Sequence, residues 1–334
     1  MIYALALTGP TASGKTALSL GIAERLGCEI ISCDSMQIYR GMDIGTAKAT
    51  AAERARVPHH LIDLISPNEV YSAESYRQDA MTAATEITAR GKIPLFVGGT
   101  GLYVDTLMRS SSPDVPGSDP EYRDRMLALS PDELWNRLLA IDPESAEKTH
   151  KNNTKRVIRA LEIYDATGKP KSYFDKLSRT AAADITIGMI TIDFHDRDNL
   201  YRRVDARVDA MVGEGLIDEV ESLYRAGALD GNNTASQAIG YKELIGYLKG
   251  EMTLSDALES VKLASRRYAK RQLTWFRHND AERIFADRED GLLRPIDELC
   301  ATATATAERL YEKISGSVRR KNIMAADAAT EKKR

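Results

Sequence analysis

Two patterns of apolar residues alternate over the first hundred positions of the chain. Short apolar runs occupy residues 3–7, 29–34 and 93–97. Between them, residues 16–26 and 73–90 carry apolar side chains at helical spacing, and each stretch is followed by a glycine suited to a helix C-terminus. Short strands that alternate with helices predict βαβ units and a parallel sheet.

The pattern changes after residue 110. Residues 110–120 are rich in serine, proline, glycine and aspartate and predict a linker. Helical patterns then run to Ala166, an apolar strand returns at residues 185–194, and nearly all of residues 198–278 is predicted to be helical. We therefore expect an α/β fold, in which helices flank a parallel sheet core and a helical insertion domain interrupts it. The expected parts are 1–112 (core, first part), 113–183 (insertion), 184–315 (core, second and mostly helical part) and 316–334, a tail without apolar periodicity that we expect to be disordered.

Composition excludes several classes of protein. The 334 residues are 43% hydrophobic and 28% charged, as in soluble globular proteins, and the net charge is −3, so any nucleic-acid surface must be a local basic patch. Three cysteines are too few for a disulfide framework and lack the partners of a zinc site. No stretch approaches the length of a membrane span, and the N-terminus lacks the basic segment of a signal peptide. We therefore expect a cytoplasmic protein.

A glycine-rich segment after the first predicted strand matches the P-loop pattern G-x-x-x-x-G-K-[ST]. Glycines let backbone N–H groups converge on phosphate oxygens, and the N-terminus of the next helix adds its positive dipole end. Lys15 supplies a mobile charge, and the Thr16 hydroxyl is placed to ligate Mg²⁺. The motif predicts a P-loop-type core and a diphosphate or polyphosphate site, without specifying a nucleotide. Its members are Gly9, Pro10, Thr11, Ala12, Ser13, Gly14, Lys15 and Thr16.

Two other polar residues follow predicted strands. Asp34 ends the run 29–34, and Thr100 stands between two glycines after the run 93–97. Ligands of a doubly wound sheet bind beyond the carboxyl ends of its strands, so both residues should face the phosphates. From position alone, Asp34 is a metal carboxylate, a general base or a helix cap. Thr100 either approaches a ligand or belongs to a tight turn.

Two stretches without acidic residues are basic. Residues 262–278 carry six Lys and Arg side chains over about half of a helical wheel, and residues 148–159 carry five more within the predicted insertion. We favour contact with a phosphate backbone over plain solvation of these charges. Two basic surfaces on two domains suit a clamp around a folded nucleic acid.

Five segments, in this order, resemble the bacterial tRNA dimethylallyltransferases over residues 1–315: Gly9–Thr16, Asp34–Tyr39, Gly98–Tyr103, Gly240–Tyr241 and Lys270–Arg277. The resemblance implies transfer of a dimethylallyl group from dimethylallyl diphosphate to N6 of the adenine 3′-adjacent to the anticodon. It implies that the P-loop grips the diphosphate of the donor, that Asp34 is the base on the N6 amine, and that Thr100 contacts the reacting diphosphate.

The resemblance also implies the partners of the enzyme. They are the anticodon stem-loop of tRNA, dimethylallyl diphosphate and Mg²⁺, and we expect a monomer. The implied tRNA contacts are Asp34, Ser35, Met36, Gln37, Arg123, Lys155, Arg156, Val157, Ile158, Arg159, Gln237, Ala238, Ile239, Gly240, Tyr241 and Lys242, to which the basic helix adds Arg266, Lys270 and Arg271.

Three other functions are compatible with parts of the sequence. A small-molecule or nucleotide kinase would use the same P-loop, Asp34 and a basic lid, with ATP as its substrate. An RNA-binding protein with a nucleotide switch would not need Asp34 or Thr100 for chemistry. An adenylate isopentenyltransferase would keep the chemistry and use AMP as the acceptor, but AMP needs no basic clamp.

Overall fold

The computed structural model describes residues 1–108, 115, 117–180, 184–229 and 233–331. Two compact units divide the chain. The first consists of Met1–Met108 and Ile185–Arg334, and the second is Arg109–Asp184, in the part of the chain where the sequence predicts an insertion. Most of the predicted linker, residues 109–114 and 116, lies outside the described residues.

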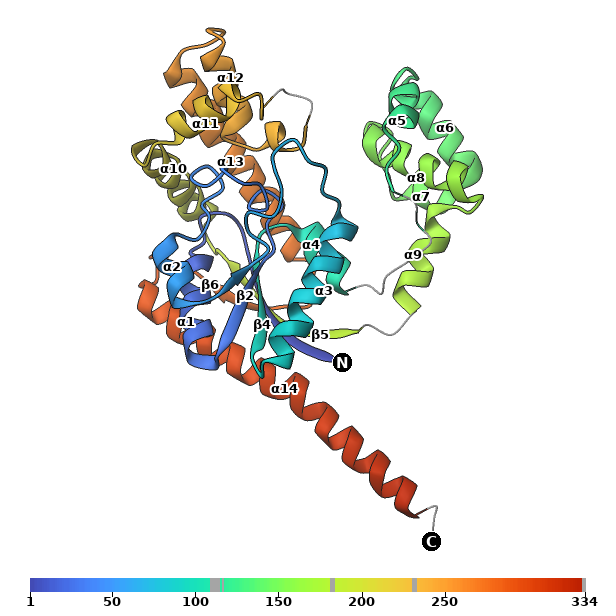
Figure 1. The fold of residues 1–334 in the computed structure, drawn as a ribbon, viewed down its shortest axis with the longest axis vertical. Coiled ribbons are helices and arrows are strands. Elements are labelled where there is room, and N and C mark those ends of the chain that lie inside the picture. The colour runs from blue at the N-terminus through green and yellow to red at the C-terminus, as the bar shows by residue number, and fades with distance from the viewer. Residues whose placement is uncertain (109–114, 116, 181–183, 230–232, 332–334) are drawn as a thin grey trace. The chain divides into compact units, whose positions relative to one another are not determined.

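A six-stranded sheet in the order β3-β2-β4-β1-β5-β6 forms the centre of the first unit, and its described strands are all parallel (Figure 1). The central strand β1 pairs with β4 on one side, with Leu5 opposite Leu95, and with β5 on the other, with Ala6 opposite Met189. The predicted α/β fold with a parallel sheet core is confirmed. The strands are β1 (Ile2–Thr8), β2 (Cys28–Ser32), β3 (His59–His60), β4 (Ile93–Gly98), β5 (Ile185–Asp193) and β6 (Glu282–Phe285).

Helices cover both faces of this sheet because its strands are apolar on both sides. In β1, Leu5 and Leu7 point into a core shared with α1 and α14, whereas Ala4 and Ala6 point into a second core shared with α3 and α4. The helices of the first unit are α1 (Lys15–Leu26), α2 (Ala51–Arg56), α3 (Ala73–Ala89), α4 (Gly101–Met108), α10 (Arg197–Gly213), α11 (Leu216–Arg225), α12 (Tyr241–Leu248), α13 (Leu254–Phe276) and α14 (Ile296–Glu331), with a short 3₁₀ turn η1 (Ala235–Gln237).

A third core connects the helices α10–α13 to the segment that follows β2. Ile38, Tyr39 and Met42 of that segment are fully buried against α10–α13 residues such as Leu216 and Tyr241. This packing matters for the site, because the segment between β2 and α2 contains no helix or strand of its own over residues 33–50.

The second unit has its own small core. Leu134 and Leu138 of one helix pack against Val157, Ile158 and Leu161 of another. Its helices are α5 (Pro120–Leu127), α6 (Pro131–Ile141), α7 (Pro143–Glu147), α8 (Thr154–Thr167) and α9 (Lys171–Thr180).

The C-terminal end of the first unit is drawn as helix over its described residues. Helix α14 continues to Glu331, and residues 332–334 lie outside the described residues. Residues 325–329 are mostly alanine, the strongest helix former, so local propensity favours helix even where apolar periodicity is missing. The expectation of a disordered tail at 316–334 stays a prediction.

Candidate active site

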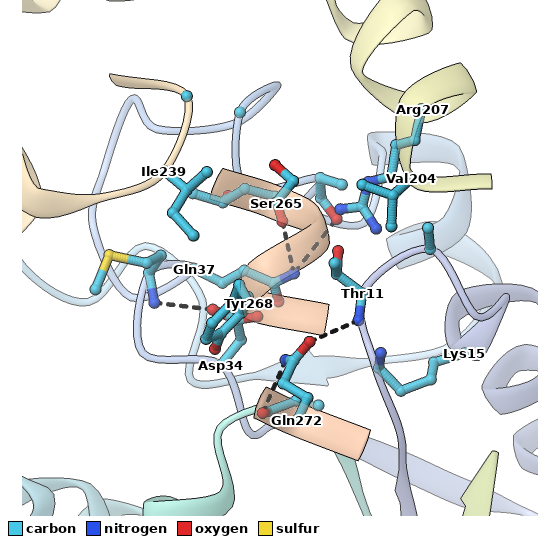
Figure 2. Close-up of a pocket in the computed structure, with 18 of the residues that line it drawn as sticks. Thr11, Lys15, Asp34, Gln37, Val204, Arg207, Ile239, Ser265, Tyr268 and Gln272 are labelled. Carbon is cyan, nitrogen blue, oxygen red and sulfur yellow. Dashed lines mark hydrogen bonds between the residues drawn. The ribbon is translucent and has the colours of Figure 1, made fainter. Parts of the chain in front are cut away.

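A cavity of about 940 Å³ lies at the carboxyl ends of β1, β2 and β4, within the first unit. Figure 2 shows Thr11 and Lys15 of the P-loop on one side of it and Asp34 and Gln37 on another, with Tyr268 of α13 between them. Much of its wall comes from residues 11–16 of the P-loop, from 34–37, 45–47 and 49 after β2, and from 97–99 after β4. Residues 203–204 and 206–208 of α10, 237–240 and 242, and 264–265, 267–268 and 271–272 of α13 also line it.

The P-loop has the curled backbone that its sequence predicts. Gly9, Ala12 and Gly14 adopt positive φ angles of 145°, 62° and 93°. A Cβ on Gly9 would lie 3.0 Å from the carbonyl oxygen of Ile192, so this position has no room for a side chain. Lys15 Nζ donates to the carbonyls of Gly9 (3.0 Å) and Pro10 (2.7 Å). Burial and, to a lesser extent, the charge of Arg207 together lower the pKa of Lys15 to about 7, while the charge of Asp34 opposes the shift.

Two side chains absent from the predicted site fasten the P-loop. Gln272 accepts a hydrogen bond from the backbone N–H of Thr11 (2.8 Å) and donates to the carbonyl of Gly99 (2.9 Å). Arg203 donates through Nε to the carbonyl of Ala12 (2.8 Å). Gln272 lies inside the motif Lys270–Arg277, but only the fold shows that its amide joins two loops.

Asp34 is placed as the sequence predicts, on the wall of the cavity after β2. Its Oδ1 accepts a hydrogen bond from the N–H of Met36 (2.9 Å), which fixes the carboxylate at the start of the segment. Oδ2 has no hydrogen-bond partner among the residues that the structure describes. One carboxylate oxygen therefore holds the loop while the other remains available to a ligand.

Thr100 is not among the described residues that line the cavity. Its Oγ1 accepts a hydrogen bond from the N–H of Ser35 (3.0 Å), and its own N–H donates to the carbonyl of Cys33 (3.2 Å). Burial and the charge of Asp34 together raise the pKa of Tyr268 to about 12, and the neighbouring Thr100 hydroxyl works against the shift. In this structure Thr100 orients the turn that carries Asp34.

Two arginines that the sequence reasoning missed add charge to the P-loop side. Arg203 and Arg207 are spaced four residues apart on α10, and both line the cavity. Burial lowers the pKa of each, and the charge of Asp34 counteracts the shift at Arg207. A search for basic pairs at i, i+4 spacing would have found them. With Lys15 they make a cationic wall for a phosphorylated ligand.

The segment predicted to contact tRNA at 237–242 divides between cavity and core. Gln237, Ala238, Ile239, Gly240 and Lys242 line the cavity. The side chain of Tyr241, in contrast, is fully buried, and its hydroxyl donates to Oε1 of Glu219 (2.6 Å). The Tyr241 side chain therefore has a structural role, and a tRNA contact at this position stays a prediction.

Half of the basic face of α13 is neutralised by carboxylates from elsewhere in the fold. Lys262 pairs with Asp209 at 2.7 Å, Arg266 with Asp205 at 2.6 Å and Arg277 with Asp193 at 2.7 Å. Arg266 is therefore committed to α10. Among the described residues, Arg267, Lys270 and Arg271 have no carboxylate within ion-pair distance, and Arg267 and Arg271 line the cavity.

In the second unit, the predicted tRNA contacts separate into three groups: exposed residues, buried residues and residues held in ion pairs. Lys155 and Arg156 are exposed. Val157 and Ile158 are buried in the core of the unit, and a tRNA contact at these two positions stays a prediction. Arg123 and Arg159 both bind the buried carboxylate of Glu162, at 3.0 Å and 2.5 Å.

Magnesium would have few protein ligands in this cavity. The described residues contain no group of three or more His, Cys, Asp or Glu side chains that could hold a metal ion. Mg²⁺ in phosphate sites keeps several waters and binds one or two protein groups together with the phosphates of the substrate. The exposed Thr16 hydroxyl at the head of α1 fits that mode.

Over its described residues, the structure has no helix that is long and apolar enough to cross a membrane.

Comparison with known proteins gives a consistent result. The family model described as IPP transferase matches residues 37–279. A tRNA dimethylallyltransferase of Pelotomaculum thermopropionicum is 46% identical over 277 residues, which are 82% of this chain and 87% of the relative. That of Bacillus velezensis is 48% identical over 277 residues, 81% of this chain and 87% of the relative.

Two solved structures are also similar to this chain. The full-length tRNA isopentenylpyrophosphate transferase of Bacillus halodurans is 41% identical, with a TM-score of 0.64 over 95% of this chain and 100% of that one. A eukaryotic dimethylallyltransferase acting on tRNA is 30% identical, with a TM-score of 0.74 over 85% of this chain and 74% of that one.

Proposed function

This chain belongs to the IPP transferase family, and from that premise we propose how its cavity performs the family's reaction. The enzyme transfers a dimethylallyl group from dimethylallyl diphosphate to N6 of the adenine 3′-adjacent to the anticodon of tRNA. The bond between the allylic carbon and the diphosphate oxygen breaks, and diphosphate leaves with the electron pair. A carbon–nitrogen bond to N6 forms, and N6 loses one proton.

The P-loop side of the cavity holds the donor. Backbone N–H groups of residues 12–16 and the N-terminus of α1 bind the diphosphate, and Lys15, Arg203 and Arg207 surround it with positive charge. These groups stabilise the charge that grows on the leaving diphosphate, which is where electrostatic catalysis acts most strongly. Mg²⁺, held by Thr16 and the phosphates, would neutralise further negative charge on the same group.

Asp34 acts on the acceptor. The proton on N6 becomes acidic only as the new bond forms, so the free Oδ2 of Asp34 accepts it late in the reaction. The adenine must leave its stack to reach a cavity inside the protein, as in other base-modifying enzymes. Val204, Ile239 and Val261 give part of the cavity an apolar lining, which suits the allylic chain.

The tRNA contacts that we propose are made by residues that line the cavity or are exposed to solvent. Near the cavity they involve Ser35, Met36 and the segment 237–240 with Lys242, and on α13 they involve the unpaired cations. In the second unit Lys155 and Arg156 are the exposed candidates. The recognised part of the tRNA is the anticodon stem-loop, and the enzyme works as a monomer in the cytoplasm.

One observation carries this assignment of roles: the P-loop cations and Asp34 line the same cavity. The test incubates the purified protein with Mg²⁺, labelled dimethylallyl diphosphate and unmodified tRNA, with AMP and no acceptor as controls. We expect label in tRNA at the adenine beside the anticodon.

Two other results would redirect the assignment. Label in AMP alone would keep the chemistry and remove tRNA as the acceptor. Consumption of ATP without any prenyl transfer would make the P-loop a kinase site.

A further inference from the structure

The segment between β2 and α2 forms the acceptor wall of the cavity without any helix or strand over residues 33–50. Eight of its residues line the cavity: Asp34, Ser35, Met36, Gln37, Gly45, Thr46, Ala47 and Ala49. An irregular segment keeps one shape only if its backbone groups and side chains find fixed partners. The partners of this segment are two oppositely charged side chains that do not themselves line the cavity, Lys48 and Glu219.

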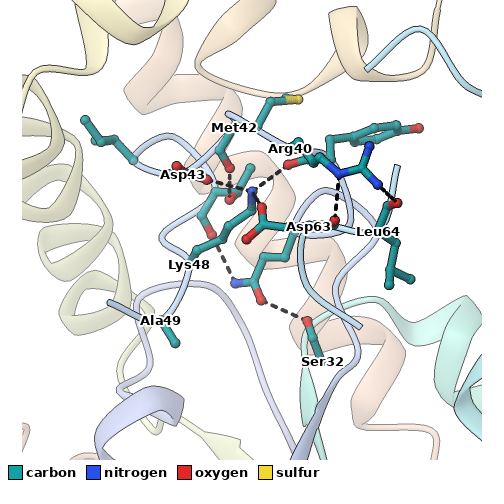
Figure 3. A network of polar contacts seen from close by, with 12 residues as sticks. Ser32, Arg40, Met42, Asp43, Lys48, Ala49, Asp63 and Leu64 are labelled. Atoms are coloured by element: carbon teal, nitrogen blue, oxygen red, sulfur yellow. Dashed lines mark hydrogen bonds and ion pairs between the residues drawn. The ribbon is translucent and has the colours of Figure 1, made fainter. Parts of the chain in front are cut away.

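Lys48 is the cation of this network (Figure 3). Its side chain is only 2% exposed, and Nζ donates to Asp43 Oδ1 (2.7 Å), Asp63 Oδ1 (2.6 Å) and the carbonyl of Tyr39. All three ammonium donors are thus used. Arg54 holds the other oxygen of Asp63 at 2.9 Å. The ammonium therefore joins both ends of the turn at 39–48 to the neighbouring loop at Asp63.

Glu219 of α11 is the anion. Its carboxylate accepts the consecutive backbone N–H groups of Asp43 (2.9 Å), Ile44 (2.8 Å) and Gly45 (3.1 Å). It also accepts the Tyr241 hydroxyl, whose ring lies so close that a Cβ on Gly45 would stand 2.5 Å from it. Carboxylate and ring together fix the tip of the turn against α11 and α12.

Gln37 connects this fixed turn to the end of β2, next to Asp34. Its amide nitrogen donates to the carbonyls of Thr46 (3.2 Å) and Ala47 (3.3 Å), in the turn that Lys48 and Glu219 hold. Its amide oxygen accepts from the hydroxyl of Ser32, the last residue of β2 (2.8 Å). The Gln37 amide is therefore occupied within the protein, and its side chain spans the turn and the strand end that carries Asp34.

We propose that Lys48 and Glu219 are positioning residues for the acceptor side of the reaction. They fix the segment that presents Asp34 to the adenine, and the donor side does not depend on them. This rests on the proposed role of Asp34 as the base. The P-loop has separate supports, the Gln272 amide and Arg203, which are on α13 and α10.

The experiment compares Lys48→Met and Glu219→Gln with wild type and with Lys92→Met. Lys92 is exposed at the other end of the sheet, before β4, and has no ion pair among the described residues, so it controls for the loss of a lysine charge. For each protein, kcat/KM for tRNA is measured at saturating donor. The Kd of dimethylallyl diphosphate is measured by calorimetry without tRNA.

We expect kcat/KM for tRNA to fall on the order of 100-fold in both variants, as for a catalytic group displaced by about 1 Å, with the donor Kd within about threefold of wild type. Lys92→Met should match wild type in both. A kcat/KM for tRNA within about threefold of wild type would overturn the proposal. A loss of donor affinity as large as the loss in kcat/KM for tRNA would overturn it as well.

Lys48→Met leaves two carboxylates without their shared cation, so its fold is checked by thermal unfolding. If it does not fold, Glu219→Gln decides by the same two measurements, because it keeps one acceptor oxygen for the turn. Failure of the wild-type protein to prenylate tRNA would refute the proposed function instead, and the wild-type reaction is run first to separate the two.

Discussion

Replacing Gln272 by leucine should weaken donor binding by loosening the P-loop. The amide of Gln272 joins the N–H of Thr11 at 2.8 Å to the carbonyl of Gly99 at 2.9 Å, and its side chain is buried. Leucine has a similar size and no polar atom. The change therefore removes both hydrogen bonds with little change in volume.

The magnitude follows from the two groups left behind. The Gly99 carbonyl is buried and loses its partner outright, at about 1–3 kcal/mol, whereas Thr11 N–H faces a cavity that water can enter and loses less. We expect a loss of roughly 2–4 kcal/mol in the free energy of unfolding, or about 5–10 °C in Tm. Donor binding must then order the loosened loop, so the donor Kd should rise about tenfold.

Calorimetry with dimethylallyl diphosphate measures the Kd, and thermal unfolding measures the Tm. Gln78→Leu on the exposed side of α3 is the matched control and should change neither. Gly99→Ala is a second route to the same effect, because its Cβ would stand 2.1 Å from the Gln272 amide nitrogen. A lowered Tm with an unchanged donor Kd in Gln272→Leu would refute the reasoning, since the P-loop would then keep its shape unaided.

The other predictions concern Asp34, the α13 cations and acid stability. Asp34→Asn should abolish transfer but keep the Kd of tRNA within about tenfold of wild type, because only one hydrogen bond of roughly 1.5 kcal/mol is lost. Retained turnover would exclude Asp34 as the base. Arg267→Ala with Arg271→Ala should reduce the slope of log Kd for tRNA against log salt by about 1–2, and an unchanged slope would leave these cations merely solvated. Burial raises the pKa of Asp63, but its bonds to Lys48 and Arg54 outweigh burial and lower it overall. Asp63 therefore stabilises the fold above its unfolded pKa of about 3.9, and this contribution is lost as pH falls through the lower folded value. The free energy of unfolding, measured with urea between pH 3 and 7, should fall less steeply towards low pH in Asp63→Asn than in wild type. An identical pH dependence would contradict the ion pair.

Local sequence was enough for the P-loop and for Asp34, because both depend on short-range rules. A glycine at positions 9 and 14 permits the positive φ angles of the loop, and the lysine and threonine follow at fixed offsets. The position of Asp34 at the end of a predicted strand placed it at the sheet edge that faces the phosphates. The structure brings both to one cavity.

The charges on α13 show where the same reasoning failed. Along the chain, residues 262–278 contain no acid, so Arg266 looked free to bind phosphate. In the fold, Asp205 of α10 lies 2.6 Å from it. Tyr241 likewise belonged to a predicted contact segment but is buried on Glu219. An ion pair or a buried hydroxyl between residues tens of positions apart leaves no periodic signal.

The parallel sheet, the phosphate loop and the carboxylate beside it were predictable from the chain, because hydrophobic period, glycine placement and strand ends are local properties. Three features emerge only in the folded protein: which cations stay unpaired, the support of the P-loop by Gln272 and Arg203, and the shaping of the acceptor segment by Lys48 and Glu219. The physical reason is that hydrogen bonds and ion pairs act within about 3 Å. The chain meets those distances only after distant helices and loops have packed together.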